Sequence, residues 1–135
     1  MDLALVLESE LEGRLADIEF PYVPRVRISS SSSRSYDVGI WICEVPVPSY
    51  SDLSSFFYFS YDFSKRLLNI AALRVDWDLA GMGFGKKLVG MAETVGMELG
   101  CSQSRVSSLG SFGRYWSSLG YTRIGEQLWE KELNV

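Results

Sequence analysis

Three closely spaced glycines followed by two lysines form the stretch of this sequence best suited to chemistry. Gly81, Gly83 and Gly85 lie in the segment 73–88 (LRVDWDLAGMGFGKKL), between an apolar run typical of a strand and a run with helical period. At such a junction the first N–H groups of the helix lack partners within it, and the helix dipole adds partial positive charge. Glycines let a ligand approach this backbone closely. The stretch therefore predicts a binding site for phosphate.

Two nucleotide-binding motifs do not fit this stretch. A P-loop requires Ser or Thr after its Gly-Lys pair, whereas Gly85 and Lys86 are followed by Lys87. A dinucleotide-binding fingerprint that begins at Gly81 requires its third glycine at position 86, which is a lysine. From the pattern alone, the alternative to a phosphate site is an ordinary turn between a strand and a helix.

The segment 80–85 (AGMGFG) resembles the pyrophosphate-binding loop of the GNAT superfamily of acetyl-CoA-dependent N-acetyltransferases, whose motif is Arg/Gln-x-x-Gly-x-Gly/Ala. A second segment, 114–121 (RYWSSLGY), is similar to the Phe-Tyr-x-x-x-Gly-Phe signature of that family and follows at the expected distance. The resemblance extends from about residue 67 to the C-terminus and is weak before it. It implies that acetyl-CoA is the co-substrate and that a primary amine of a small molecule, peptide or protein accepts the acetyl group directly.

The resemblance also implies which residues contact acetyl-CoA. Backbone groups of Leu73 and Val75 would bind the thioester carbonyl and the pantetheine amides, and the amides of residues 81–86 would bind the pyrophosphate. The implied set is Leu73, Arg74, Val75, Ala80, Gly81, Met82, Gly83, Phe84, Gly85 and Lys86. Candidate cations for the phosphates, which are otherwise solvated surface charges, are Lys86, Lys87 and Arg114.

Three positions depart from the family pattern. Ala80 replaces the Arg or Gln that usually opens the loop, so one donor is lost. Asn69 occupies the position of the glutamate base of histone-acetylating relatives, and an amide does not accept a proton usefully. Trp116 occupies the position of the tyrosine usually proposed to protonate the departing thiolate, with Tyr115 immediately before it. Asn69, Tyr115 and Trp116 are therefore the candidate catalytic positions, with a packed aromatic side chain as the alternative for Tyr115.

These departures favour an alternative, a catalytically degenerate GNAT-like domain that binds CoA or a protein partner without turnover. Transfer of a longer acyl or an aminoacyl group is a third option, because the sequence does not define the depth of the acyl pocket. Direct transfer does not require all the missing groups, because an amine with a pKa of about 10 is deprotonated in a fraction of encounters and positioning supplies much of the acceleration. Carboxylates that would act through water are Asp76, Asp62 and Glu44.

Composition excludes several classes of function. The chain of 135 residues predicts one domain, 1–135, and 47% hydrophobic residues indicate a globular protein. The formal net charge of −4 argues against a nucleic-acid binder. Histidine is absent and the two cysteines, Cys43 and Cys101, match no metal-binding spacing, so no metal site is expected. With no leader pattern and no apolar run long enough to span a bilayer, a soluble cytoplasmic protein without a membrane partner is expected.

The order of the expected elements is helix, four strands, helix, strand, helix and two strands. A helix is predicted over 2–20, a mobile serine-rich loop over 29–33, a helix from Phe84 to a glycine cap at Gly100, and a short helix over 111–119. Strands are predicted over 25–28, 38–45, 55–63, 66–77 and 104–109, with a final hairpin over 121–133. The strand at 104–109 is expected to run parallel to the one at 66–77, because a helix connects them.

Pattern and resemblance together predict an α+β, GNAT-like fold. Its sheet is expected to be mixed and mostly antiparallel, with six to seven strands, and to be flanked by helices on both faces. Since the family often forms dimers, the aromatic strand at 56–63 is the candidate interface of a homodimer.

Overall fold

The structure, a computed structural model, describes residues 3–20, 24–32, 34–42, 55–74, 83–107 and 113–133. Its helices are α1 (Leu3–Ala16), α2 (Phe84–Glu98) and α3 (Gly113–Ser118). Its strands are β1 (Arg25–Ser32), β2 (Ser35–Ile42), β3 (Ser55–Asp62), β4 (Leu67–Arg74), β5 (Gln103–Ser107), β6 (Thr122–Arg123) and β7 (Leu128–Glu132). This order of elements is the predicted one.

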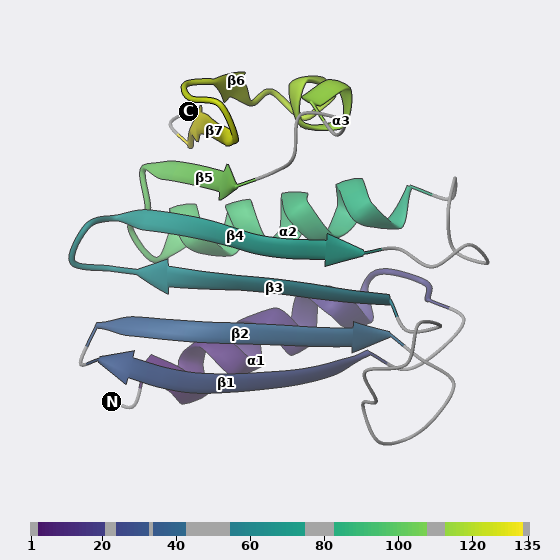
Figure 1. The fold of residues 1–135 in the computed structure, drawn as a ribbon. Coiled ribbons are helices and arrows are strands. Elements are labelled where there is room, and N and C mark those ends of the chain that lie inside the picture. Colours follow the sequence, from purple (N-terminus) through teal and green to yellow (C-terminus); the bar gives the residue numbers. More distant parts are fainter. Residues whose placement is uncertain are drawn as a thin grey trace.

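The strands form one seven-stranded sheet in the order β1-β2-β3-β4-β5-β7-β6 (Figure 1). β4 and β5 are parallel, and the other neighbouring pairs are antiparallel. The helix α2 connects β4 to β5, which a parallel pair requires because its two strands start at the same edge of the sheet. The predicted mixed, mostly antiparallel sheet of an α+β fold is therefore confirmed, as is the parallel β4–β5 pair.

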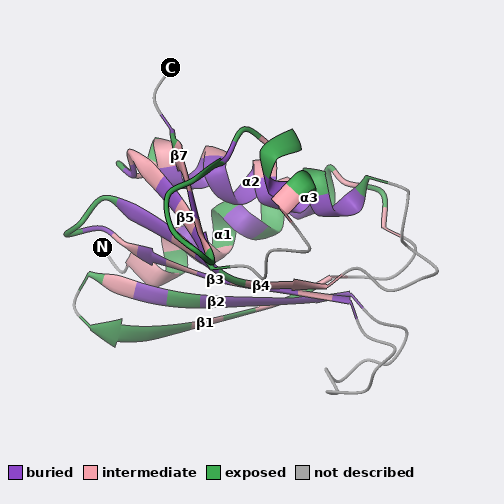
Figure 2. Ribbon diagram, turned by 45° about the horizontal axis from the view of Figure 1, so that its top comes forward, coloured by how far each residue is buried: buried purple, intermediate pink, exposed green. Residues whose placement is uncertain are grey.

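The core lies between the sheet and α1 and α2, which both cover the same face of β1–β4 (Figures 1 and 2). Burial alternates along β3, so that Phe57, Phe59 and Tyr61 point into this core. The hydroxyl of Tyr61 donates a hydrogen bond of 2.7 Å to the carbonyl oxygen of Ala92 on α2. A Cβ on Gly96 would lie 3.1 Å from the Tyr61 ring, so this glycine lets α2 pack close to the sheet.

The opposite face of β1–β4 carries none of the three described helices, whereas helices were expected on both faces (Figure 2). In the sequence, the residues of β2 are apolar on both faces. The structure shows that the Trp41 ring occupies the space beside Gly39, where an added Cβ would be 2.6 Å from the indole. The second face of β2 is thus covered by one of its own aromatic side chains. We call this the open face of the sheet.

Two predicted boundaries are wrong. The segment 29–33 was expected to be a mobile loop, but Ser29, Ser30 and Ser32 pair with β2 as the end of β1. Strand pairing uses backbone groups, and the serine hydroxyls add bonds of their own, such as Ser30 Oγ to the carbonyl oxygen of Ser32 at 2.7 Å. The first helix ends at Ala16 and not at residue 20.

No helix in the described part of the chain is long and apolar enough to cross a membrane.

Candidate functional site

The N-terminus of α2 is the predicted phosphate site, and its geometry follows from Gly83. This residue caps the helix in the left-handed conformation, with φ of +78°, and a Cβ added to it would meet no atom within 4 Å. The first hydrogen bond of the helix runs from Lys87 N to Gly83 O at 3.1 Å. The N–H groups of residues 84–86 therefore precede the ladder, and no side chain caps the helix at Gly83. A 15-residue helix with such an end favours an anionic ligand.

The charges near this helix end favour an anion as well. Lys86 and Lys87 are exposed in the first turn, which holds no acidic residue. The ammonium of Lys87 lies 5.6 Å from the centre of the Phe84 ring, over the start of the helix. Arg114, the third predicted cation, is exposed on α3. Val75, Ala80, Gly81 and Met82 of the predicted cofactor set lie outside the described residues, as do the candidate carboxylates Asp76 and Glu44.

Beside this helix end, the pairing of β4 with β5 stops before β4 does. Described pairing ends at Ile70 and Val106, although β4 continues to Arg74. Ala71 is an extra residue in β4, since Phe59 pairs with Ile70 and Tyr58 with Ala72. Bulges of this kind bend and twist a strand, and they often occur next to active sites. Along residues 71–73 the backbone edge directed away from β3 has no partner among the described residues of β5, which suits it to bind an extended ligand.

Tyr115 is the predicted catalytic residue that the structure brings to this opening. A Cβ on Gly85 would overlap the Tyr115 hydroxyl, and it would lie 3.6 Å from Cδ2 of Leu73. The hydroxyl oxygen is buried and has no hydrogen-bond partner within the described residues. Burial raises the pKa of Tyr115 above its usual value of 10.0, so the phenol stays protonated at neutral pH. A protonated donor that has no acceptor among the described residues therefore lies at the junction of β4 and α2.

The other candidate catalytic positions lie elsewhere. Trp116 is only 4% exposed and packs edge-on against Tyr121, with ring centres 5.4 Å apart, so it belongs to the core. Asn69 pairs with Ser60 on one side and with Arg105 on the other, four residues before Leu73. It is half-buried between the buried Leu68 and Ile70, and strand alternation places it on the open face, opposite to α2.

Of the three candidate carboxylates, the structure describes Asp62. This residue has a structural role in the turn between β3 and β4. It accepts hydrogen bonds from Ser64 Oγ at 2.7 Å and from the backbone N of Lys65 at 3.1 Å. The bond from Ser64 is the main reason why the pKa of Asp62 is lowered. This carboxylate stabilises the β3–β4 turn, at the opposite end of β4 from Leu73.

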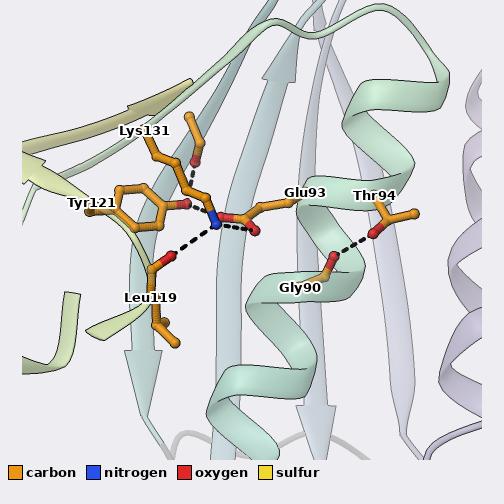
Figure 3. Close-up of polar contacts among 7 residues, drawn as sticks. Gly90, Glu93, Thr94, Leu119, Tyr121 and Lys131 are labelled. Carbon is orange, nitrogen blue, oxygen red and sulfur yellow. Dashed lines mark hydrogen bonds and ion pairs between the residues drawn. The ribbon is translucent and has the colours of Figure 1, made fainter. Parts of the chain in front are cut away.

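A polar network that the sequence analysis missed connects α2, α3 and β7 (Figure 3). The ammonium of Lys131 lies 3.0 Å from Glu93 Oε1 and donates to the carbonyl oxygen of Leu119, just after α3, at 2.9 Å. The Tyr121 hydroxyl donates to Glu93 Oε2 at 2.7 Å and lies 2.6 Å from Ser104 Oγ. The network ties the end of α3 to α2 and so helps to hold Tyr115 against Gly85. In the sequence, the network is indicated only by Glu93, a carboxylate among the apolar residues of α2.

Among the described residues no three Cys, Asp or Glu side chains lie close enough together to hold a metal ion. No family profile matches the sequence, and no curated protein matches it.

Solved structures do match the fold. A nourseothricin acetyltransferase aligns with a TM-score of 0.58 and 15% identity, over 90% of this chain and 94% of that one. GCN5 from Tetrahymena aligns with a TM-score of 0.56 and 12% identity, over 98% and 87% of the two chains. An acetyltransferase of the GNAT family from Staphylococcus aureus Mu50 aligns with a TM-score of 0.54 and 10% identity, over 76% and 70%. At such identities the likeness concerns the fold, and the protein has the GNAT fold of these acetyltransferases.

Proposed function

We propose that this protein is an N-acetyltransferase that moves an acetyl group from acetyl-CoA to a primary amine. The observation that carries the proposal is the juxtaposition of three features at one place. These are the glycine-capped N-terminus of α2, the end of the β4–β5 pairing and the unpartnered hydroxyl of Tyr115. The helix N-terminus is suited to bind the pyrophosphate, and the edge of β4 along residues 71–73 is suited to bind the pantetheine arm. The Tyr115 hydroxyl is suited to donate a hydrogen bond to the departing sulfur. Acetyltransferases with the same fold support the assignment.

Each part of the site then has a task. Acetyl-CoA, when bound, supplies an acetyl thioester whose acyl group an amine can take. The N–H groups of Phe84, Gly85 and Lys86 donate to phosphate oxygens, and the bare Gly83 allows them to approach. The β4 backbone after Ile70 orients the extended arm. Tyr115 keeps its proton at neutral pH because burial raises its pKa, and it donates a hydrogen bond to the sulfur as the carbon–sulfur bond breaks. The amine loses one proton on becoming an amide, and the departing thiolate takes up one proton through solvent, so Tyr115 remains protonated.

Because Asn69 stands where a glutamate base would be, the amine acceptor loses its proton to solvent. An amide side chain exchanges no proton with an amine, so the reactive fraction is the free base, set by the pKa of the amine. We therefore expect activity with an alkylamine to rise with pH through the neutral range.

A domain that binds CoA without turnover is the second candidate. It is favoured by Asn69 and by the burial of Trp116 in the core, since neither provides acid or base chemistry. The two candidates differ in turnover and share the cofactor site.

Calorimetric titration with acetyl-CoA and with CoA tests what both candidates share. We expect micromolar affinity for acetyl-CoA, and no binding at millimolar concentration would refute both. Release of CoA thiol in the presence of amines then separates them. Amine-dependent release supports the enzyme, and its absence across primary amines, despite micromolar binding, supports the binding domain.

A further inference from the structure

The open face of β1–β4 holds a pocket of about 790 Å³, separate from the α2 N-terminus. Its lining comes from all four strands and includes Arg27, Asp37, Trp41, Tyr58 and Ala71. The lining also includes Glu8 of α1 together with Val26 and Ile28, so the pocket continues past the edge strand β1 to the face that α1 covers. A pocket of this volume lies within the range that proteins use for small ligands.

Two polar groups in this pocket lack partners in the described part of the chain. The guanidinium of Arg27 lies 5.9 Å from the centre of the Trp41 ring, and no described carboxylate is within ion-pair distance of it. The hydroxyl oxygen of Tyr58 is buried and has no hydrogen-bond partner there. The rings of Trp41 and Tyr58 meet edge to face, with centres 5.4 Å apart. An arginine on an aromatic wall, with its donors unused, is suited to a carboxylate.

The register places these groups on one line across the sheet. Arg27 pairs with Gly39, Gly39 pairs with Tyr58, and Tyr58 pairs with Ala72, next to the extra residue Ala71. Neighbouring strands are about 4.8 Å apart, so about 14 Å separates the backbone at Arg27 from that at Ala71. Ala71 is exposed and directly follows Ile70, where pairing with β5 ends. The pocket and the opening between β4 and β5 therefore meet at Ala71.

The next line across the sheet consists of side chains with oxygen acceptors. Asp37 pairs with Ser60, and Ser60 pairs with Asn69. Asp37 lies on β2, next to the strand that carries Arg27, and the uncharged Ser60 and Asn69 continue the line to β4. The orientation of an acceptor is therefore set by the opening between β4 and β5, which requires the amine at β4 and leaves the far end of the ligand at Arg27.

We propose that this pocket binds the acceptor, and that the acceptor is the N-terminus of an acidic peptide. The inference rests on the proposed function. The amine lies at Ala71 beside Asn69, the chain runs over Trp41 and Tyr58, and a carboxylate of the third residue binds Arg27. Three residues of extended chain span about 10 Å, and a glutamate side chain supplies the remaining reach.

The test measures peptide affinity calorimetrically, without acetyl-CoA. The probes are the amidated tripeptides Ala-Phe-Glu and Ala-Phe-Gln, which have the same size and differ in one charge. We expect the glutamate peptide to bind about tenfold more tightly, as for a hydrogen bond to a charged group, and the ratio to fall as salt is raised. The variant Arg27→Gln should bind both peptides equally, and Arg34→Gln, an exposed turn arginine, should keep the preference.

Equal affinity of the wild-type protein for the two peptides, no binding of either, or an unchanged preference in Arg27→Gln would each overturn the inference. Because the assay needs no cofactor, it separates this inference from the proposed function. A glutamate preference in a protein that does not bind acetyl-CoA supports the pocket and refutes the enzyme. Micromolar acetyl-CoA binding without that preference refutes the pocket alone.

Discussion

The hydroxyl of Tyr115, on α3, occupies the space that a side chain at Gly85, on α2, would need. Two residues 30 positions apart in the sequence thus share one space, which holds either the Tyr115 hydroxyl or a side chain at position 85. Because Gly85 has no side chain, the Tyr115 hydroxyl can lie at the start of α2.

The substitution Gly85→Ala should displace that hydroxyl. We expect it to lower the free energy of unfolding by about 1–3 kcal/mol through overpacking, partly offset by about 1 kcal/mol from the higher helix propensity of alanine. Tyr115→Phe alone should be close to neutral or stabilising, since the buried hydroxyl makes no bond within the described residues. In Gly85→Ala/Tyr115→Phe the smaller ring should recover most of the loss. Strictly additive effects in urea unfolding would contradict the contact.

Gly83→Glu should abolish acetyl-CoA binding while the protein stays folded. The substitution places bulk and negative charge where the phosphates are expected, so calorimetry should show at least a tenfold loss of affinity. Gly100→Glu is the matched control, because Gly100 also has positive φ, of 106°, and also has no atom within 4 Å of an added Cβ. Both variants place a side chain at a positive φ and add the same charge. Equal affinities for acetyl-CoA in the two variants would argue against the cradle at α2.

Removing Lys131 should be much more costly than removing Arg105. Lys131→Met leaves the Glu93 carboxylate, 8% exposed, without its cation, and we expect a loss of about 3 kcal/mol in unfolding free energy. Arg105→Met breaks the more exposed pair with Glu130, 2.7 Å apart, and should cost less than about 1 kcal/mol. Adding Glu93→Gln to Lys131→Met should restore part of the stability. A similar loss in both single variants would show that burial of the Glu93 pair has no energetic weight.

Stability should fall above pH 9. Burial raises the pKa of the Cys101 thiol from 9.0 to about 11 in the folded protein. Because the folded pKa is the higher one, this contribution is fully present below pH 9 and is lost as the pH rises toward 11. One pKa unit corresponds to about 1.4 kcal/mol, so the full loss is about 3 kcal/mol, of which about 2 kcal/mol has occurred at pH 10.5. Urea unfolding at pH 8 and pH 10.5 checks this, and Cys101→Ala should have a smaller difference between the two. An equal difference in wild type and variant would assign the effect to other groups, such as Tyr61, whose pKa is also raised by burial.

Hydrophobic period and glycine position were sufficient to predict the type and order of the elements. The strand predicted over 55–63 is β3, along which buried and half-buried residues alternate, and Gly100 and Gly120 end their helices with positive φ, as terminal glycines do. These features are local, because each depends on residues a few positions apart. The strand at 29–32 was missed for the same reason, since its pairing depends on the backbone of β2 and not on its serines.

The sequence by itself determined the fold class, the glycine-capped helix and the candidate stretch around it. Which of the candidate catalytic side chains reaches that stretch was decided by the tertiary structure alone. The positions 115 and 116 are adjacent, and only the packing of α3 turns Tyr115 toward Gly85 and Trp116 into the core. The ion pair of Glu93 with Lys131 and the line from Arg27 to Ala71 likewise join residues far apart in the chain. No local pattern encodes such contacts, because they arise from the register of strands and the docking of helices.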